Sequence, residues 1–125
     1  MKITDIETIP LRVPHEARNR KKYHHFYLRE EVTVYKFHTD TGLVGLGERV
    51  GSPIDQRELE LYLGTDPFDH VMGTGLFNLD MACYDLMGKH LGMPAWKLMG
   101  QQVREWVSMG WWMPCMSPED SAAEV

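Results

Sequence analysis

The stretch from Leu76 to Gly92, LFNLDMACYDLMGKHLG, decides how the rest of the chain is arranged. Its apolar residues recur at the spacing of one helix face and then fill a second face, so the predicted helix is apolar on most sides. Lys89 and His90 stand in the last turn, where positive charge suits the helix dipole. Gly92 followed by Pro94 is a typical helix end. Such a helix needs packing partners on several sides.

Length and composition limit the classes of protein to consider. The 125 residues suit one domain, or one domain with part of a second. A hydrophobic fraction of 43% is enough for a core, and a net charge of −5 argues against a dedicated nucleic-acid binder. The chain has two cysteines, no secretory signal and no apolar run of roughly 18 residues. We therefore expect a cytoplasmic protein with reduced thiols and no membrane partner.

Residues 2–13 predict the first strand of an antiparallel sheet. Apolar and polar residues alternate from Ile9 onward, with the period of two that a strand requires. Ile3 and Ile6 break this parity, which predicts a bulge or a twist between them. Pro10 cannot donate to a ladder, so the strand is expected at an edge of the sheet.

Residues 31–49 predict a hairpin that supplies the second and third strands. The turn is expected at Asp-Thr-Gly, residues 40–42, where glycine accepts a positive φ. Gly45 and Gly47 place two bare positions on one face of the third strand. Their spacing leaves room for another backbone to approach closely.

Shorter helices are predicted on both sides of the long one. Asp55 is a candidate N-cap, and Glu58 stands where a capping box places its acid. Residues 94–99 predict a short helix closed by Gly100.

Two carboxylates lie on the long helix. Asp80 and Asp85 are five residues apart and face different directions, which disfavours a paired acid and base. We expect a backbone or arginine partner for Asp80, because a buried unpaired carboxylate is costly.

The residue composition of the chain changes after Gly100. Residues 103–113 are rich in Val, Trp and Met and predict a buried strand. Ser117 and Pro118 then predict a helix start, with serine as N-cap and proline in the first turn. A strand followed by a helix indicates the first β/α unit of a parallel fold. Because this helix starts so near Val125, we expect an incomplete domain.

Residues 14–29 form a basic, aromatic segment that we interpret as a long loop. Positions 12–29 hold six basic residues against one acid. The segment is either a solvated loop or a cover that attracts an anion. A metal site formed by His15, His24 and His25 is disfavoured, because adjacent histidine side chains point in different directions. Contact with a substrate, or an ordinary surface position, is favoured for these histidines instead.

The whole chain resembles the N-terminal part of the mandelate racemase/muconate lactonizing enzyme group of the enolase superfamily. The matching pieces are KITDIETIPLRVP, HTDTGLVGLGE, GTDPFDH and LDMACYDLMGKHLGMPAWKLMGQQVREWV, in this order. The resemblance implies an α+β fold, with a three-stranded antiparallel meander followed by helices. Residues 1–100 would form the capping domain, and 101–125 the first strand and the start of the first helix of an incomplete (β/α)₇β barrel. The segment 70–75 is shorter than the family's usual helical excursion.

The resemblance also implies an activity. Such enzymes abstract a proton α to a carboxylate, with Mg²⁺ stabilising the enediolate. Racemisation, dehydration and cycloisomerisation are the outcomes, and the substrate expected here is a hydroxy or sugar acid. The metal ligands and catalytic bases lie on later barrel strands, so none is expected in this chain, which alone should be inactive. A homo-oligomer is expected for the full-length enzyme.

In this family, two loops of the capping domain enclose the substrate, and they correspond to residues 14–26 and 49–53. Either Trp111 or Trp112 on the first barrel strand would face the barrel interior near its substrate end, and core packing is favoured for both. The candidate substrate-binding residues are therefore His15, Arg20, Lys22, Tyr23, His24, His25, Arg49 and Trp111. The alternative is a stand-alone α+β module that binds an anionic partner or single-stranded nucleic acid through residues 14–29.

Overall fold

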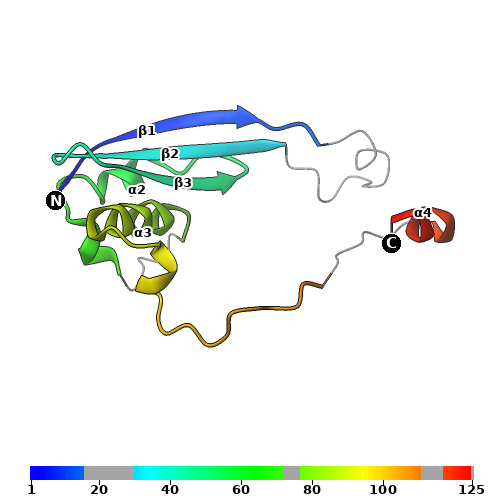
Figure 1. Ribbon diagram of the computed structural model, residues 1–125. Helices are drawn as coiled ribbons and strands as arrows, with labels where there is room; N and C mark the ends of the chain where they lie inside the picture. The colour runs from blue at the N-terminus through cyan, green and yellow to red at the C-terminus, as the bar shows by residue number, and fades with distance from the viewer. Residues whose placement is uncertain (16–29, 72–76, 111–116, 125) are drawn as a thin grey trace.

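The computed structural model describes residues 1–15, 30–71, 77–110 and 117–124 (Figure 1). A three-stranded sheet packs on helices that follow it in the chain. The elements are β1 (Ile3–Arg12), β2 (Glu31–Thr39), β3 (Val44–Val50), α2 (Gln56–Glu60), η1 (Pro67–His70), α3 (Phe77–Leu91), η2 (Ala95–Leu98) and α4 (Pro118–Glu124). None of the helices in these ranges has the length and apolar character to cross a membrane.

The sheet is the predicted antiparallel meander, in the order β1-β2-β3. The expected bulge is confirmed, because the register between β1 and β2 shifts between Ile3 and Asp5. Beside the bulge, the N–H of Ile3 donates to the carbonyl of Thr65 at 3.0 Å, and the N–H of Gly64 donates to the carbonyl of Ile3 at 2.8 Å. The chain after α2 therefore covers the start of the edge strand.

The hairpin turn and the helix end are also confirmed. Gly42 has a φ of 81° in the turn between β2 and β3. Gly92 has a φ of 64° directly after α3, and the N–H of Met93 donates back to the carbonyl of Gly88 at 2.9 Å. Both glycines adopt the left-handed region that other residues avoid.

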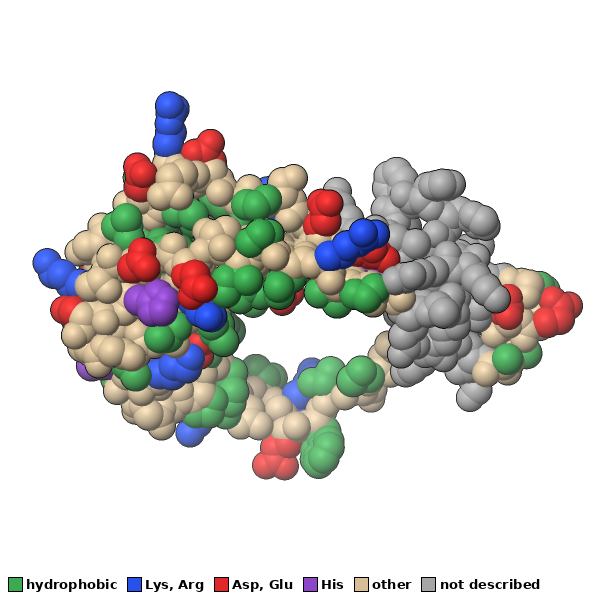
Figure 2. Space-filling model, turned by 90° about the horizontal axis from the view of Figure 1, so that it is seen from above, with side chains coloured by type: hydrophobic (Ala, Val, Ile, Leu, Met, Phe, Trp, Pro, Cys, Tyr) green, Lys and Arg blue, Asp and Glu red, His purple; other side chains and the backbone are tan. Residues whose placement is uncertain are grey.

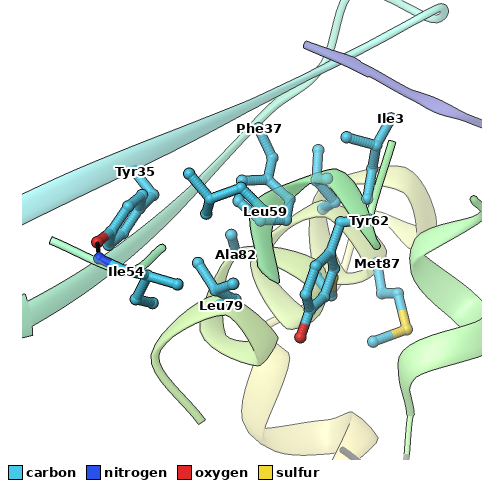
Figure 3. Close-up of a cluster of buried hydrophobic side chains, with 11 residues drawn as sticks. Ile3, Tyr35, Phe37, Ile54, Leu59, Tyr62, Leu79, Ala82 and Met87 are labelled. Atoms are coloured by element: carbon cyan, nitrogen blue, oxygen red, sulfur yellow. Dashed lines mark hydrogen bonds between the residues drawn. The ribbon is translucent and has the colours of Figure 1, made fainter. Parts of the chain in front are cut away.

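The core lies between the sheet and α3 (Figure 3). The closest approach is at Gly45, where a Cβ would lie 2.3 Å from the carbonyl oxygen of Ala82 and 2.6 Å from Cγ of Leu86. Only glycine fits there, so the bare position expected from the sequence is filled by the helix. The buried hydrophobic residues are Ile3, Tyr35, Phe37, Ile54, Leu59, Tyr62, Leu79, Ala82, Cys83, Leu86 and Met87.

A polar network lies within this core. The hydroxyl of Tyr62 donates to Oδ1 of Asp80 at 3.0 Å, and the Tyr62 ring stacks on His70 with a centroid distance of 4.6 Å. Nε2 of His70 lies 2.8 Å from Oγ1 of Thr65. The hydroxyl of Tyr62 was not foreseen as a partner of Asp80, for which we expected a backbone or arginine group.

The helix starts follow their predicted caps. The carboxylate of Asp55 accepts the N–H of Arg57 at 2.9 Å before α2, as expected of an N-cap. Oγ of Ser117 accepts the N–H of Asp120 at 3.1 Å before α4. In both cases a side-chain oxygen satisfies a donor that the first turn leaves unpaired.

The predicted buried strand over 103–113 is wrong where the structure describes it. Residues 101–110 are extended and exposed, and no described strand lies beside them. The apolar side chains of Val103, Trp106, Val107 and Met109 are between 70% and 90% exposed. In Figure 2, hydrophobic side chains project from the extended segment that leaves the folded body. Composition predicted the strand, but a strand forms only with a neighbour to complete its ladder. Residues 111–113 lie outside the described ranges.

Candidate functional site

The two connections predicted to enclose the substrate, residues 14–26 and 49–53, begin at the same end of the sheet. The N–H of Val13 donates to the carbonyl of Glu30 at 2.7 Å, and the N–H of Gly51 donates to the carbonyl of Glu31 at 2.8 Å. The chain after β1, the chain before β2 and the chain after β3 therefore meet. We call residues 13–15, 30–31 and 49–54 the loop end of the sheet.

Of the candidate substrate-binding residues, His15 and Arg49 belong to this loop end. The meander brings them there from positions far apart in the sequence, because β1 and β3 run in the same direction on either side of β2. The other candidates, Arg20, Lys22, Tyr23, His24, His25 and Trp111, lie outside the described residues.

Arg49 is the cation of the loop end that remains available for an anion. It is half-buried and lies opposite Thr33, on the sheet face that packs on the helices. Within the described part of the chain it makes no salt bridge. A guanidinium in this state can bind a carboxylate through two parallel hydrogen bonds.

Arg12, which added to the basic charge of this region in the sequence, is already paired. Its Nε lies 2.9 Å from Oε2 of Glu30, across the start of the connection between β1 and β2. Arg12 is 81% exposed, so the pair contributes little to stability. The pairing does neutralise the positive charge of Arg12, which composition alone would count as available to bind an anion.

The connection from β3 to α2 is held at both ends. Gly51 has a φ of 98° and bonds to Glu31, as described above. At the other end, the N–H of Ile54 donates to the hydroxyl of Tyr35 at 2.7 Å (Figure 3). Sequence reasoning missed this tyrosine. The signal that was available is a phenol in a buried strand position, which usually requires a hydrogen-bond partner.

The described residues fit neither a metal site nor a thiol nucleophile. Across the ranges that the structure covers, no three His, Cys, Asp or Glu side chains converge as metal ligands do. Burial, with a smaller contribution from the carboxylate of Asp80, raises the pKa of Cys83 to about 12. A thiol with this pKa remains protonated near neutral pH and is a poor nucleophile.

The fold is that of known isomerases. An isomerase from Streptomyces coelicolor A3(2) is 28% identical, with a TM-score of 0.59 over 82% of this chain and 32% of its own. A candidate mandelate racemase/muconate lactonizing enzyme from Labrenzia alexandrii DFL-11 is 25% identical, with a TM-score of 0.59 over 84% of this chain and 32% of its own. A dipeptide epimerase from Enterococcus faecalis V583, 22% identical with a TM-score of 0.56, covers 80% of this chain and 33% of its own, and shows the fold alone.

The part of these proteins that matches is limited. The chain spans about a third of the length of the solved structures just named. Its three-stranded antiparallel sheet followed by helices matches the N-terminal capping domain of enolase-superfamily proteins. No family model matches the chain, and no curated protein does.

Proposed function

We propose that this chain is the substrate-capping part of an enzyme of the mandelate racemase/muconate lactonizing enzyme group, which abstracts a proton α to a carboxylate. The observation that carries the proposal is the loop end of the sheet. Both connections meet there, and an arginine with no described salt bridge stands beside them, on a fold shared with isomerases. The substrate is a small carboxylate, a hydroxy acid or sugar acid.

The proposed role of the chain is to bind and enclose this acid. Arg49 receives the substrate carboxylate, and His15 contributes a polar contact from the other connection. The sequence between β1 and β2 is rich in Arg and Lys, and this positive charge would attract an anion. Closing such loops over the acid excludes water and strengthens the electrostatic interactions inside the site.

The chemistry itself is assigned to other parts of the enzyme. Mg²⁺, when bound, stabilises the negative charge of an enediolate. The described residues provide no cluster that would hold it, so the proposal places its ligands, and the catalytic bases, outside them. A homo-oligomer is part of the same proposal.

The test uses the complete product of the reading frame that carries this sequence. Exchange of the α-proton with deuterium is followed by NMR for a panel of hydroxy acids and sugar acids, in the presence of Mg²⁺. We expect at least one acid to exchange, and R49M to raise its KM about tenfold or more, as expected when a charge-assisted hydrogen bond is lost. K36M is the control, because Lys36 pairs with Glu7 at 3.2 Å, far along the sheet from the loop end.

Two results would contradict the proposal. One is the absence of α-proton exchange with every acid of the panel, and the other is an unchanged KM in R49M. Binding of single-stranded DNA with a steep salt dependence, in the absence of exchange, would instead favour the stand-alone module.

A further inference from the structure

We propose that the hydroxyl of Tyr35 is a positioning group for the substrate carboxylate. It fixes residues 51–54, and through them it holds Arg49 in the orientation that receives the acid. This inference rests on the proposed function, since it concerns how the same site is kept ready to bind.

The connection between β3 and α2 is short and is bonded to β2 at both ends. The N–H of Gly51 bonds to the carbonyl of Glu31 at 2.8 Å, and the N–H of Ile54 bonds to Oη of Tyr35 at 2.7 Å. Ser52 and Pro53, which lie between these bonds, are exposed. The path of the connection is therefore set by the two hydrogen bonds and by the packing of Ile54 in the core, and not by the side chains of Ser52 and Pro53.

The position of Tyr35 makes this anchor rigid. It belongs to the central strand and is completely buried, and Ile54 is only 6% exposed. Tyr35 lies opposite Gly47 in the register, a position without a side chain. Figure 3 shows the hydroxyl directed at the backbone nitrogen of Ile54. A phenylalanine would fill the same volume, so the specific contribution of the tyrosine is this hydrogen bond.

Arg49 is coupled to the anchor through the backbone. It precedes Gly51 by two residues and shares the inner face of the sheet with Tyr35, because Gly47 pairs with Tyr35 and Arg49 pairs with Thr33. Without the bond to Ile54, the end of β3 would be fixed against the chain that follows only by the bond at Gly51 and by the apolar packing of the Ile54 side chain. The arginine would then sample more orientations, and binding of the carboxylate would have to restrict them.

The test compares Y35F with Y62F in the complete gene product. Both tyrosines are completely buried, and each substitution removes the buried hydroxyl hydrogen bond described above. Tyr62 bonds to Asp80 of α3 and is not part of the loop end, so Y62F controls for a general loss of stability. Three quantities are measured: the hydrogen-exchange rate of the Ile54 amide, and KM and kcat for the acid that exchanges fastest in the panel above.

We expect the Ile54 amide in Y35F to exchange on the order of tenfold faster than in Y62F at equal global stability, because its partner is gone. We also expect KM to rise several-fold in Y35F with kcat less affected, and to stay near the wild-type value in Y62F. Equal KM values in the two variants would overturn the positioning role, and unchanged Ile54 exchange in Y35F would overturn the anchor itself. If the wild-type protein exchanges no acid, the proposed function fails and the positioning role falls with it, while Ile54 exchange still reports on the anchor.

Discussion

Asp85 and Lys89, one turn apart on α3, together cover part of the free edge of β3. The carboxylate of Asp85 accepts the N–H of Leu46 at 2.9 Å, and the ammonium of Lys89 donates to the carbonyl of Val44 at 2.6 Å. The two side chains also bond to each other at 2.6 Å. They thus supply the acceptor and the donor that a fourth strand would otherwise provide, at an edge that could pair with another chain.

Removing this pair is expected to expose the edge. In D85A/K89A, the N–H of Leu46 and the carbonyl of Val44 lose their partners, which should cost about 1–2 kcal/mol of unfolding free energy and promote association. Urea denaturation and light scattering after size-exclusion chromatography measure the two effects. E7A/K36A is the matched control, because it removes a cross-strand pair that covers no backbone group. Equal behaviour of the two double variants would contradict the edge-covering role.

Gly45 should be very hard to replace. A Cβ at this position meets backbone oxygen of Ala82, which cannot move without shifting α3. We expect G45A to lower the unfolding free energy by about 2–3 kcal/mol or more, as overpacking of a core does. G110A is the control, since a Cβ on Gly110 meets nothing within 4 Å. Similar urea midpoints for both variants would show that the sheet and the helix do not touch there.

Cys83 should make the protein less stable at high pH. Its pKa is about 12 in the folded chain, because of burial and the nearby Asp80, against an ordinary value of 9.0. The folded state therefore holds the proton more tightly than the unfolded state. This stabilisation is complete below pH 9 and is lost, at up to about 1.4 kcal/mol per pH unit, as the pH rises toward 12. Urea denaturation of the wild type and C83A at pH 8 to 11 measures the difference.

The contribution of Cys83 appears as a narrowing gap between the unfolding free energies of the two proteins, because C83A lacks only this thiol and keeps Cys115 and the same lysines and tyrosines. A constant gap from pH 8 to 11 would contradict the raised pKa.

The burial of Cys83 also predicts slow chemical modification. In a C115S background, the thiol of Cys83 should react with an aromatic disulfide reagent only as fast as the protein opens.

Asp66 should make the stability of the fold depend on pH in the acidic range. Burial alone would raise its pKa, but the hydrogen bond from the N–H of Phe68 and the ammonium of Met1, 3.2 Å away, hold the pKa below its ordinary 3.8. The stabilisation is present above pH 3.8 and is lost as the pH falls below it. D66N should thus be less stable than the wild type at pH 7, by less than about 1 kcal/mol because the group is partly exposed.

The stability gap between D66N and the wild type should narrow in thermal melts as the pH falls below 3.8. D69N is the neighbouring control, since Asp69 is exposed on the same short helix and pairs with no described residue. A gap that persists unchanged at pH 2 would show that the carboxylate charge is not what stabilises the fold.

Local signals in the sequence predicted the fold where the residue itself fixes the backbone. Gly42, Gly92 and Ser117 act within a few residues of their own positions, and each was confirmed. The strand over 103–113 failed where it was described, because apolar composition reports which side chains are present and not whether a neighbouring strand exists.

For the candidate site, the sequence could predict only which connections lie together. A meander necessarily brings the chain after its first strand and the chain after its third strand to one end, so His15 and Arg49 could be grouped from the sequence. The contacts that shape this end could not. Tyr35 with Ile54, and Arg12 with Glu30, are separated by 19 and 18 residues, and no local pattern relates them.

The bonds of Ile3 to Gly64 and Thr65 have a consequence for synthesis on the ribosome. β1 is made first, yet these partners follow roughly 60 residues later, on the order of 3–12 s at ordinary elongation rates. The nascent strand spends this interval with its edge open. Its charged residues, Asp5, Glu7 and Arg12, oppose wrong pairing with neighbouring nascent chains. Neutralising them should therefore lower the yield of folded protein during translation more than it lowers the stability of the finished fold.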